Sequence, residues 1–427
     1  MKLSIDAFNL ARPHGTGIAT YGRILARTAK ALGHDVSLLF GDKTGYSKDP
    51  LLNEIALIEA GRQDRKRLPV PVLVQRGIEA LSGTLKARGG FEVPMSGQVV
   101  MPVGLPPEAD RLWNVQNLYS GADIGFRAAR RFTSIANYGV DLAHWTYPLP
   151  VRMPKARNVY TLHDLVPLKL PYTTADTKRV YYRMCRRIAR EADHILTVSE
   201  CSRRDIIEML GVEPGRVTNL YQASDAAQTL EGVGEADIAR YVEGVLGIPP
   251  KGYFLFFSAI EPKKNVAHLL EAYLGSGTQT PLVIVGAPGW GSVHDMALIK
   301  SMAALDTGKR VRWLGFLPRA TLTRLIAGAR AVLFPSLYEG FGLPVLEAME
   351  LGTPVITSNT SCLQEVGGDA PHYVDPYDVQ SILTAIRTVD ADSALRADMA
   401  SKGLVQAKHF SAASYQARLA KFYGTFQ

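Results

Sequence analysis

The sequence has few cysteines and no long apolar run. Its 427 residues include three cysteines, which lie far apart and form no Cys-x-x-Cys pair: Cys185, Cys201 and Cys362. Neither a disulfide framework nor a structural zinc site is therefore predicted. No segment approaches the ~18 uninterrupted apolar residues of a membrane-spanning helix, and Met1 to Asp6 contains no stretch long enough for a signal-peptide core. We expect a protein of the reducing cytoplasm that would meet a membrane only from the side.

Signatures of several other protein classes are also missing. The chain has no Gly-x-x-x-x-Gly-Lys-[Ser/Thr] phosphate loop, no internal repeat and no low-complexity tract, which disfavours kinases and ATPases. With 47% apolar and 21% charged residues, the composition is that of an ordinary globular protein. Because a domain usually has ~150 residues, the length predicts two or three domains.

The excess of positive charge lies entirely in the first half of the chain. Residues 1–225 contain 31 Lys and Arg against 22 Asp and Glu, whereas residues 226–427 contain 17 against 18. This asymmetry indicates that the first half approaches something anionic, either a membrane surface, a phosphorylated ligand or a nucleic acid. No nucleic acid is expected, because no basic patch interleaved with aromatic residues accompanies the charge.

Strand and helix patterns alternate along the first half. Lys2 to Asp6 is typical of a strand, Ile18 to Leu32 has helical apolar spacing, and Val36 to Phe40 is typical of the next strand. Further strands are predicted at 98–101, 112–115, 142–145, 158–163, 194–199 and 217–221. The alternation predicts an α/β domain over 1–225 with a doubly wound parallel sheet. It is interrupted over 42–97 by a less regular insertion with a basic cluster at Arg62, Arg65, Lys66 and Arg67.

A second domain is predicted after a break in this rhythm. Residues 226–250 contain four glycines and end in two prolines, which predicts a linker. Strands are then expected at 253–258, 282–285, 311–314, 331–334, 354–357 and 372–374. They predict a second Rossmann-like domain over 251–406. Because ligands of open α/β sheets bind at the carboxyl ends of the strands, two facing domains would bind theirs in a central cleft.

The strongest local signal is the segment Phe334 to Ala348, FPSLYEGFGLPVLEA, at a strand-to-helix junction. Its carboxylates, Glu339 and Glu347, flank a turn in which Gly340 and Gly342 permit close approach of a ligand to the backbone. The amino end of the following helix can hold an anion. Carboxylates accept hydrogen bonds from paired hydroxyls. The segment therefore fits a sugar on one side of a diphosphate and a ribose on the other, which is the shape of a nucleotide sugar.

With this motif, the chain resembles the retaining glycosyltransferases of family four, which have the GT-B fold. Glu-x7-Glu at 339–347 is the family's hallmark, and the other motifs follow in the family's order: Gly15-Thr-Gly-Ile-Ala-Thr-Tyr, Thr161-Leu-His-Asp164, Val198-Ser199, Glu261-Pro-Lys-Lys-Asn265 and Phe410-Ser411. The resemblance implies two Rossmann-like domains facing a central cleft. It also implies a final helix within 407–427 that packs back on the first domain.

The resemblance gives roles to the glycine-bearing turn. Glu339 would contact hydroxyls of the donor sugar and act as a catalytic residue, and Glu347 would hold the ribose. The turn itself would meet the sugar or its diphosphate through Gly340, Phe341, Gly342 and Leu343. The alternatives are a solvated loop Glu, a helix-surface Glu and a turn whose glycines serve only its geometry.

Two lysines follow the first strand of the second domain. The resemblance implies that Lys263 and Lys264 neutralise the diphosphate leaving group, which gains charge as the glycosidic bond breaks. Neither a metal nor another cofactor would then be needed. Many relatives have an Arg five positions before the Lys, where this chain has Ala259, and Lys263 would compensate. The alternative for Lys263 is a solvated turn.

Other donor-site residues are implied in loops of both domains. His163 and Asp164 end a strand and would face the cleft, with His163 as a catalytic residue; the alternatives are a packed His and an Asp that caps the next turn. Gly15 and Gly17 would approach the phosphate, and the third glycine of a dinucleotide fingerprint is missing after them. A base pocket, or a loop packing on its own sheet, would contain Gly315, Phe316 and Leu317.

Residues 176–192 predict a strongly basic helix. Its charges are Lys178, Arg179, Arg183, Arg186, Arg187 and Arg190. With the 62–67 cluster, this helix would rest on anionic lipid, as in family members with lipid-diphosphate acceptors, at roughly 1 kcal/mol per basic residue. A solvated helix face is the equal alternative.

The sequence therefore predicts a retaining hexosyltransferase of bacterial polysaccharide or lipopolysaccharide synthesis, in the cytoplasm or on the inner face of the membrane. The His-Asp-Leu-Val-Pro segment resembles bacterial mannosyltransferases, so GDP-mannose is the expected donor and a glycan or lipid-diphosphate-linked glycan the expected acceptor. The alternatives are UDP-glucose or another nucleotide hexose as donor, or a non-catalytic nucleotide-sugar-binding protein. An NAD-dependent oxidoreductase is disfavoured by the broken glycine fingerprint.

Overall fold

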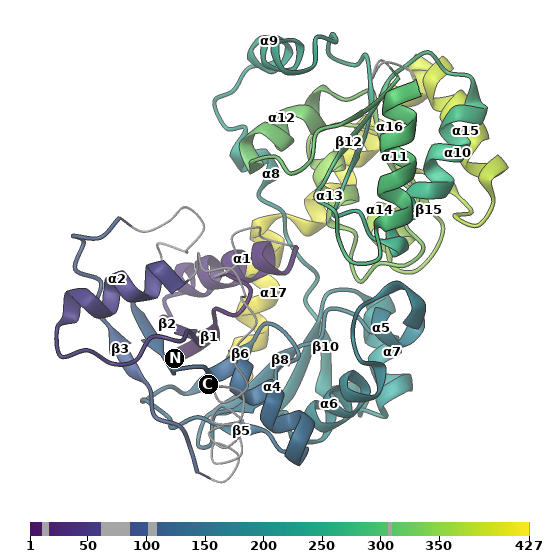
Figure 1. Cartoon of the computed structure of the whole chain (residues 1–427). Coiled ribbons are helices and arrows are strands. Elements are labelled where there is room, and N and C mark those ends of the chain that lie inside the picture. Colours follow the sequence, from purple (N-terminus) through teal and green to yellow (C-terminus); the bar gives the residue numbers. More distant parts are fainter. Residues whose placement is uncertain (11–16, 61–85, 101–108, 306–309, 427) are drawn as a thin grey trace.

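The chain forms two lobes, each built on a parallel sheet. The structure is a computed structural model that describes residues 1–10, 17–60, 86–100, 109–305 and 310–426. Figure 1 shows the chain passing from the lower lobe, which contains its first strand, to the upper lobe and back. We call them the first and the second lobe.

Eight strands form the sheet of the first lobe: β1 (Lys2–Asp6), β2 (Asp35–Phe40), β3 (Phe91–Val93), β4 (Arg111–Asn114), β6 (Leu142–Trp145), β8 (Arg157–Thr161), β9 (His194–Thr197) and β10 (Val217–Asn219). Their order is β10-β9-β8-β6-β1-β2-β4-β3, and among these described strands only β3 is antiparallel to its neighbour. The chain starts at β1 and winds outward first through β2 and then through β6, so the direction reverses between β1 and β6. Two short strands, β5 (Thr133–Ser134) and β7 (Val151–Arg152), pair separately.

Six parallel strands form the sheet of the second lobe: β11 (Phe254–Phe257), β12 (Leu282–Val285), β13 (Val311–Trp313), β14 (Ala331–Phe334), β15 (Val355–Ser358) and β16 (His372–Val374). Their order is β13-β12-β11-β14-β15-β16, so the reversal lies between β11 and β14. β11 reads FLFF and β12 reads LVIV, and every one of these residues is buried. Such unbroken apolar strands are expected where helices cover both faces of a sheet.

Helices connect the strands in both lobes. The first lobe has α1 (Gly17–Ala31), α2 (Pro50–Ala60), α4 (Leu118–Ala129), α5 (Val166–Lys169), α6 (Lys178–Glu191) and α7 (Glu200–Leu210). The later part of the chain has α8 (Ala226–Thr229), α9 (Glu235–Leu246), α10 (Val266–Ser276), α11 (Val293–Leu305), α12 (Arg319–Gly328), α13 (Leu343–Glu350), α14 (Leu363–Gly367), α15 (Val379–Ala391), α16 (Ser393–Ala407) and α17 (Ala412–Gly424). The predicted α/β class with two doubly wound parallel sheets is confirmed.

The last helix, α17, packs in the first lobe, against α1 (Figure 1). Its Tyr415 and Tyr423 are fully buried. The Tyr423 hydroxyl lies 2.8 Å from Nδ1 of His144 in β6, and Nε of Arg418 donates to the carbonyl of Leu220 at 2.8 Å. The core of the first lobe is thus completed by the last residues of the chain.

The structure differs from the sequence prediction in two connecting segments. The expected linker 226–250 contains α8 and α9, and α9 packs on α12 through the buried Val242 and Leu246. The expected strand 98–101 is absent at 98–100, and residue 101 lies outside the described residues. The expected insertion contains α2 and β3, whereas the basic cluster at 62–67 also lies outside the described residues.

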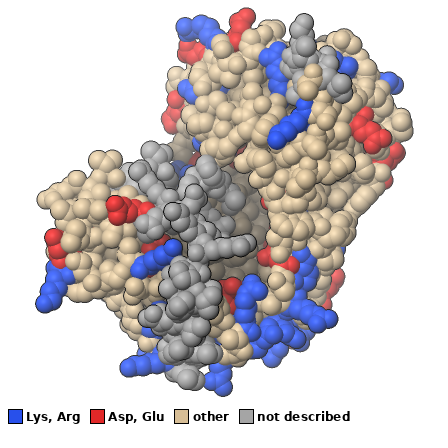
Figure 2. Space-filling view, viewed as in Figure 1, with Lys and Arg blue, Asp and Glu red and all other residues tan. Residues whose placement is uncertain are grey.

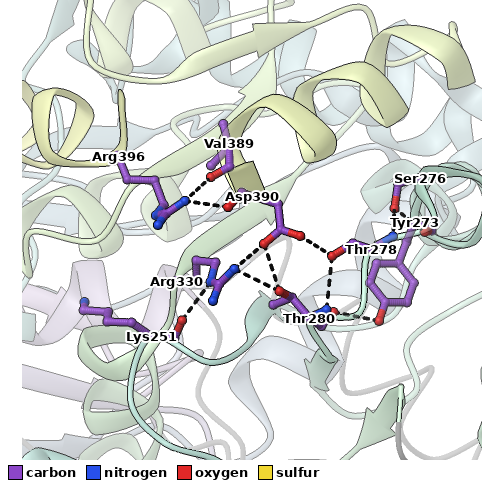
Figure 3. A network of polar contacts seen from close by, with 9 residues as sticks. All are labelled: Lys251, Tyr273, Ser276, Thr278, Thr280, Arg330, Val389, Asp390 and Arg396. Atoms are coloured by element: carbon purple, nitrogen blue, oxygen red, sulfur yellow. Dashed lines mark hydrogen bonds and ion pairs between the residues drawn. The ribbon is translucent and has the colours of Figure 1, made fainter. Parts of the chain in front are cut away.

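A network of hydrogen bonds and an ion pair connects α15 and α16 to the amino-terminal edge of the second sheet (Figure 3). Asp390, at the end of α15, accepts hydrogen bonds from Thr278, from Thr280 at 2.8 Å and from Arg330. Arg396 of α16 donates to the Asp390 carbonyl at 2.7 Å. Thr278 and Thr280 precede β12, and Arg330 precedes β14, so this network lies at the edge opposite to the one where ligands bind. We interpret it as structural.

Candidate active site

The reversal point of the second sheet brings a carboxylate and two lysines together. Lys263 and Lys264 lie in the short helix Pro262–Lys264 that follows β11, and Glu339 follows β14, the neighbouring strand. Nζ of Lys264 donates to Oε1 of Glu339 at 2.6 Å, and Oγ of Ser336 donates to the same oxygen at 2.6 Å. Both charged side chains are more than nine-tenths buried. Residues 75 positions apart therefore form one buried ion pair at this edge.

The charges at this edge stabilise one another. Burial alone would raise the pKa of Glu339, but the positive charges of Lys264 and Lys263 hold that pKa below its ordinary value. Burial would lower the pKa of Lys263, but the charges of Glu339, Asp164 and Glu261 raise it above its ordinary value. The carboxylate and the Lys263 ammonium are therefore both ionised at neutral pH, and the ammonium supplies positive charge for an anion.

The turn after Glu339 leads into α13 with free backbone donors. Gly342 precedes the helix with a positive φ of 92°, a conformation that favours glycine. Within the described part of the chain, the N–H groups of Phe341, Gly342 and Leu343 have no hydrogen-bond acceptor. The Phe341 side chain is buried against the ring of Phe410, with the ring centroids 5.5 Å apart. The backbone, and not this side chain, is thus available to a ligand.

The first lobe touches this turn closely. A Cβ atom at Gly340 would lie 2.8 Å from Oδ2 of Asp164 and 2.9 Å from the carbonyl oxygen of His163. A Cβ atom at Gly17, the first residue of α1, would lie 3.0 Å from the side chain of Leu343, the first residue of α13. Two helix amino ends, one from each lobe, therefore meet at the turn. Gly15 lies outside the described residues.

His163 follows β8 and presents an unused acceptor. Its Nε2 lies 2.9 Å from the carbonyl of Thr146, and its buried Nδ1 has no hydrogen-bond partner among the described residues. A carbonyl only accepts, so Nε2 carries the hydrogen and Nδ1 carries the lone pair. Burial lowers the pKa of His163, although the Thr146 carbonyl and the charge of Asp164 act in the opposite direction. A neutral imidazole is thus held with Nδ1 ready to accept from a hydroxyl. Oδ1 of Asp164 accepts from the amide of Val166 at 3.0 Å, as a turn cap does.

Glu347 lies in α13 and is 5% exposed. Nη1 of Arg319 donates to its Oε1 at 2.7 Å, and Nη2 of Arg319 donates to Oδ1 of Asp225 at 2.9 Å. Burial raises the pKa of Glu347, although Arg319 opposes this shift. Neither Arg319 nor Asp225 is among the residues predicted from the sequence. A signal was present, because a cation in the first turn of a helix faces the positive end of the helix dipole and needs a specific partner.

The predicted base-pocket residues follow β13, which is separated from β14 by β12 and β11. Gly315 has a positive φ of 66°, and its carbonyl accepts from the amide of Gly286 at 2.7 Å. Phe316 is 50% exposed, whereas Leu317 packs against the core of the lobe. Only Phe316 of this loop therefore offers a large apolar surface outside the core.

A latch between the lobes, which is not predicted from the sequence, lies beside the turn. We define it as the contacts of Ser199 and Glu365. Oγ of Ser199 donates to the carbonyl of Gly340 at 2.7 Å. The Glu365 carboxylate of α14 accepts from the amides of Glu200 at 2.6 Å and Cys201 at 3.1 Å, at the amino end of α7. A negative charge at this end of a helix is favourable.

Figure 2 shows a hollow between the two lobes, and Lys and Arg side chains gathered in the region of α6. In that helix Arg179, Arg183 and Arg190 are exposed, whereas Arg187 pairs with Glu191 at 2.5 Å. Among the described residues, no group of three or more His, Cys, Asp and Glu has the arrangement of a metal site. In the same part of the chain, no helix combines the length and the apolar character needed to span a membrane.

Known proteins resemble this chain in sequence and in fold. Residues 244–405 match the family model of glycosyl transferases group 1, and residues 16–221 match that of the glycosyl transferase 4-like domain. The chain is 35% identical over 270 residues to O-antigen chain mannosyltransferase B of Escherichia coli, a match that covers 62% of this chain and 68% of that protein. It is 28% identical over 307 residues to the serotype-specific mannosyltransferase WbdA of Escherichia coli, covering 66% of this chain but only 36% of WbdA.

A solved structure of sucrose-phosphate synthase from Thermosynechococcus elongatus has the same fold. Its TM-score is 0.69 at 16% sequence identity, and the match covers 100% of this chain and 98% of that one. The predicted GT-B architecture is thereby confirmed.

Proposed function

The chain belongs to the group 1 glycosyl transferases with a glycosyl transferase 4-like first domain, and from this premise we propose that it transfers mannose from GDP-mannose, with retention at the anomeric carbon. The names of the two relatives, both mannosyltransferases, support mannose as the sugar. We propose further that the acceptor is a glycan or a lipid-diphosphate-linked glycan of a bacterial surface polysaccharide.

The observation that carries this proposal is the meeting of anion-binding and hydroxyl-binding groups at the Glu339 turn. Lys263, Lys264 and the free amides of α13 supply positive charge and donors for a diphosphate. From the first lobe, Nδ1 of His163, which has no partner among the described residues, supplies an acceptor for a sugar hydroxyl. A nucleotide sugar needs both kinds of group within one site.

The chemistry follows from where charge develops. As the bond between the anomeric carbon and the diphosphate breaks, the electron pair remains with the leaving phosphate oxygen. The lysines and the amides are already in place to stabilise that charge, so little reorganisation is needed. Glu339 and His163 orient the sugar through its hydroxyls. The acceptor hydroxyl attacks from the face that the diphosphate leaves, and a phosphate oxygen receives its proton, so the configuration is retained.

We propose that this reaction needs no metal, because the two lysines supply the positive charge that a divalent cation supplies elsewhere. The buried pairing of Lys264 with Glu339 supports the proposal, since it fixes a cation at the amino end of α13 before any donor arrives. Activity that persists in a chelator such as EDTA is the expected result.

We also propose that the enzyme works in the cytoplasm and rests on the inner face of the membrane through α6. The exposed arginines of that helix, which Figure 2 shows gathered on one region of the first lobe, support an anionic lipid surface as partner. Sedimentation with vesicles that contain phosphatidylglycerol, but not with vesicles of phosphatidylcholine alone, is expected.

The test of the donor begins with thermal unfolding in the presence of GDP, UDP and ADP. A nucleotide at about 100 times its dissociation constant stabilises the folded state by about 2.7 kcal/mol. GDP is expected to give the largest shift, and GDP release from GDP-mannose should follow, even slowly and without acceptor. A larger shift with UDP would replace mannose by the UDP-glucose alternative, and binding without any turnover would indicate a binding protein.

A further inference from the structure

Arg319 forms a bridge that none of the predicted site roles explains. It is the first residue of α12, and its guanidinium joins two carboxylates from different parts of the chain. Nη1 donates to Oε1 of Glu347 at 2.7 Å, and Nη2 donates to Oδ1 of Asp225 at 2.9 Å. Asp225 lies just before α8, where the chain leaves the first lobe.

The place of Arg319 is unfavourable without these partners. The amino end of a helix is positive, so a guanidinium there is repelled, and ordering a long side chain costs conformational entropy. Thirty per cent of the Arg319 side chain is exposed, against 7% of the Glu347 side chain. The arginine therefore reaches from the rim of the site to a buried carboxylate, and its position depends on that carboxylate and on Asp225.

The bridge leaves one oxygen of Glu347 unused. Oε1 is engaged by Arg319, whereas Oε2 has no hydrogen-bond partner among the described residues. A carboxylate fixed at one oxygen cannot rotate freely about its terminal bond, so the direction in which the other oxygen accepts is also fixed. Such preorganisation reduces the entropy that a ligand hydroxyl loses when it binds.

We propose that Arg319 is a positioning residue for nucleotide binding: it fixes the Glu347 carboxylate so that the free oxygen accepts from the vicinal hydroxyls of the donor's ribose. The proposal rests on the proposed function, because it takes Glu347 as the carboxylate that meets the ribose. Asp225 holds the second arm of the guanidinium and so keeps Arg319 directed at Glu347.

The charge around Glu347 gives the bridge a second effect. The charged groups that act on Glu347 are Arg319 of α12, Asp225 before α8 and Glu350 of α13 itself. Burial and the two carboxylates raise the pKa of Glu347, and Arg319 alone lowers it. Without Arg319, Glu347 takes up a proton at a higher pH. A protonated carboxyl donates through one oxygen and matches two donor hydroxyls poorly.

The experiment compares Arg319→Gln with Arg324→Gln. Arg324 lies in the same helix, over the ring of Tyr241, and forms no ion pair with a carboxylate of the described residues. Titration calorimetry gives the dissociation constants of GDP and of 2′,3′-dideoxy-GDP. In Arg319→Gln, GDP is expected to bind about 10-fold more weakly at about pH 6 and only about 3-fold more weakly at about pH 8.5. Dideoxy-GDP should bind equally to the wild type and to this variant, and Arg324→Gln should match the wild type throughout.

Two further variants separate positioning from a merely structural role. Arg319→Lys keeps the positive charge but loses the two-armed guanidinium that joins Glu347 to Asp225. It should therefore weaken GDP binding by a factor that does not depend on pH. Arg319→Gln combined with Glu347→Gln should bind GDP no more weakly than Glu347→Gln alone, since both changes remove the same contact.

The proposal is overturned if Arg319→Gln weakens the binding of GDP and of dideoxy-GDP by the same factor, or if its loss of GDP affinity is independent of pH. It is also overturned if the losses of GDP affinity in Arg319→Gln and Glu347→Gln add in the double variant. A wild type that binds no nucleoside diphosphate would instead overturn the proposed function itself. If Arg319→Gln does not fold, the binding of GDP and of dideoxy-GDP to Arg319→Lys decides: weaker binding of GDP alone supports the proposal, and an equal loss with both overturns it.

Discussion

The ion pair of Glu339 and Lys264 is the central feature of the site at the scale of single residues. Each partner satisfies the other, and Ser336 adds a second hydrogen bond to the carboxylate. A buried pair of this kind contributes little to stability relative to apolar residues, but removing one charge leaves the other uncompensated. Its retention in the core of an enzyme is therefore better explained by what the charges do to a ligand.

Glu339→Gln should impair turnover more than folding. The amide has the same shape and keeps an oxygen for Lys264, so the variant should fold although unfolding becomes easier by about 3–5 kcal/mol, whereas donor turnover should fall roughly 100-fold. Turnover of the proposed donor, GDP-mannose, and the thermal midpoint are measured together. The control is Glu271→Gln, an exposed charge on α10 that should change neither. Unchanged turnover in folded Glu339→Gln would remove Glu339 from the mechanism.

Asp6 ends β1 at the reversal point of the first sheet, and its carboxyl group should make the stability of the protein depend on pH. Its carboxylate accepts from the amides of Thr146 and, at 3.2 Å, Phe8. Burial raises its pKa to about 6, against those hydrogen bonds. In the unfolded chain the pKa is ordinary, near 3.8. The folded state thus binds the proton more tightly, and the stabilisation present below about pH 4 is lost as the pH rises through about 6.

The measurement is the free energy of unfolding of the wild type and of Asp6→Asn at several pH values. The shift corresponds to roughly 3 kcal/mol, so the variant should gain up to that amount relative to the wild type between about pH 4 and about pH 6. Asp123→Asn, on the surface of α4, should follow the wild type. Parallel curves for wild type and Asp6→Asn would contradict a raised pKa for Asp6.

How far the sequence predicts these residues depends on distance along the chain. Glu339 and Glu347 are predicted because they share one local motif with the turn between them. The pairing of these carboxylates with Lys264 and Arg319 is not predicted, since the partners reach them only through the order of strands in the sheet. Lys264 was predicted for a diphosphate, and its direct bond to Glu339 came from the structure alone.

At the scale of elements, the turn before α13 controls how near the lobes come. The Gly340 carbonyl accepts from Ser199, and the space beside Gly340 is filled by His163 and Asp164 of the other lobe. The φ of Gly340 is not positive, so the constraint is one of space between lobes and not of backbone strain.

Gly340→Ala should therefore hold the lobes apart and leave each lobe intact. Its methyl group would meet Asp164 and His163 at less than 3.0 Å. The KM for the proposed donor, GDP-mannose, should rise, or turnover should fall, by about 10-fold, with a thermal midpoint near that of the wild type. Gly244→Ala, in α9 with nothing within 4 Å, should be neutral or stabilising. A fully active Gly340→Ala would show that the close approach is not needed.

Helix α9 shows why the element boundaries were only partly predictable. Four glycines suggested a linker over 226–250, yet Ile238, Val242 and Leu246 recur at the four-residue spacing of a helix face. Val242 and Leu246 are buried. The packing of this face on α12 outweighs the low helix propensity of Gly244, as tertiary contacts commonly do. The apolar strands, by contrast, were placed to within a few residues, because burial on both faces leaves a continuous apolar run.

At the scale of the whole molecule, the latch of Ser199 and Glu365 holds the lobes together around the site. It could not be predicted from sequence, because it depends on how two separately folded sheets face each other. The Glu365 carboxylate makes two charge-assisted hydrogen bonds to the amino end of α7, and each such bond contributes roughly 1.5–3 kcal/mol.

Glu365→Ala should thus shift the protein toward an open arrangement of the lobes. A loss of about 1.4 kcal/mol lowers the ratio of closed to open molecules about 10-fold. Small-angle scattering is expected to give a larger radius of gyration for this variant than for the wild type, and GDP should reduce the difference. Glu208→Ala removes an exposed carboxylate from α7 itself and should scatter like the wild type. Identical scattering from Glu365→Ala and the wild type would contradict the role of the latch.

The return of α17 to the first lobe also has a consequence for biosynthesis. A ribosome releases the first lobe long before Tyr415 and Tyr423 exist, yet these side chains fill its core. The surface that α17 later covers, around α1 and His144, must stay exposed to the cell while the whole second lobe is made. The lobe that is synthesised first is therefore the last to be completed, and a nascent chain stalled before residue 412 would present an unfinished apolar core to chaperones and proteases.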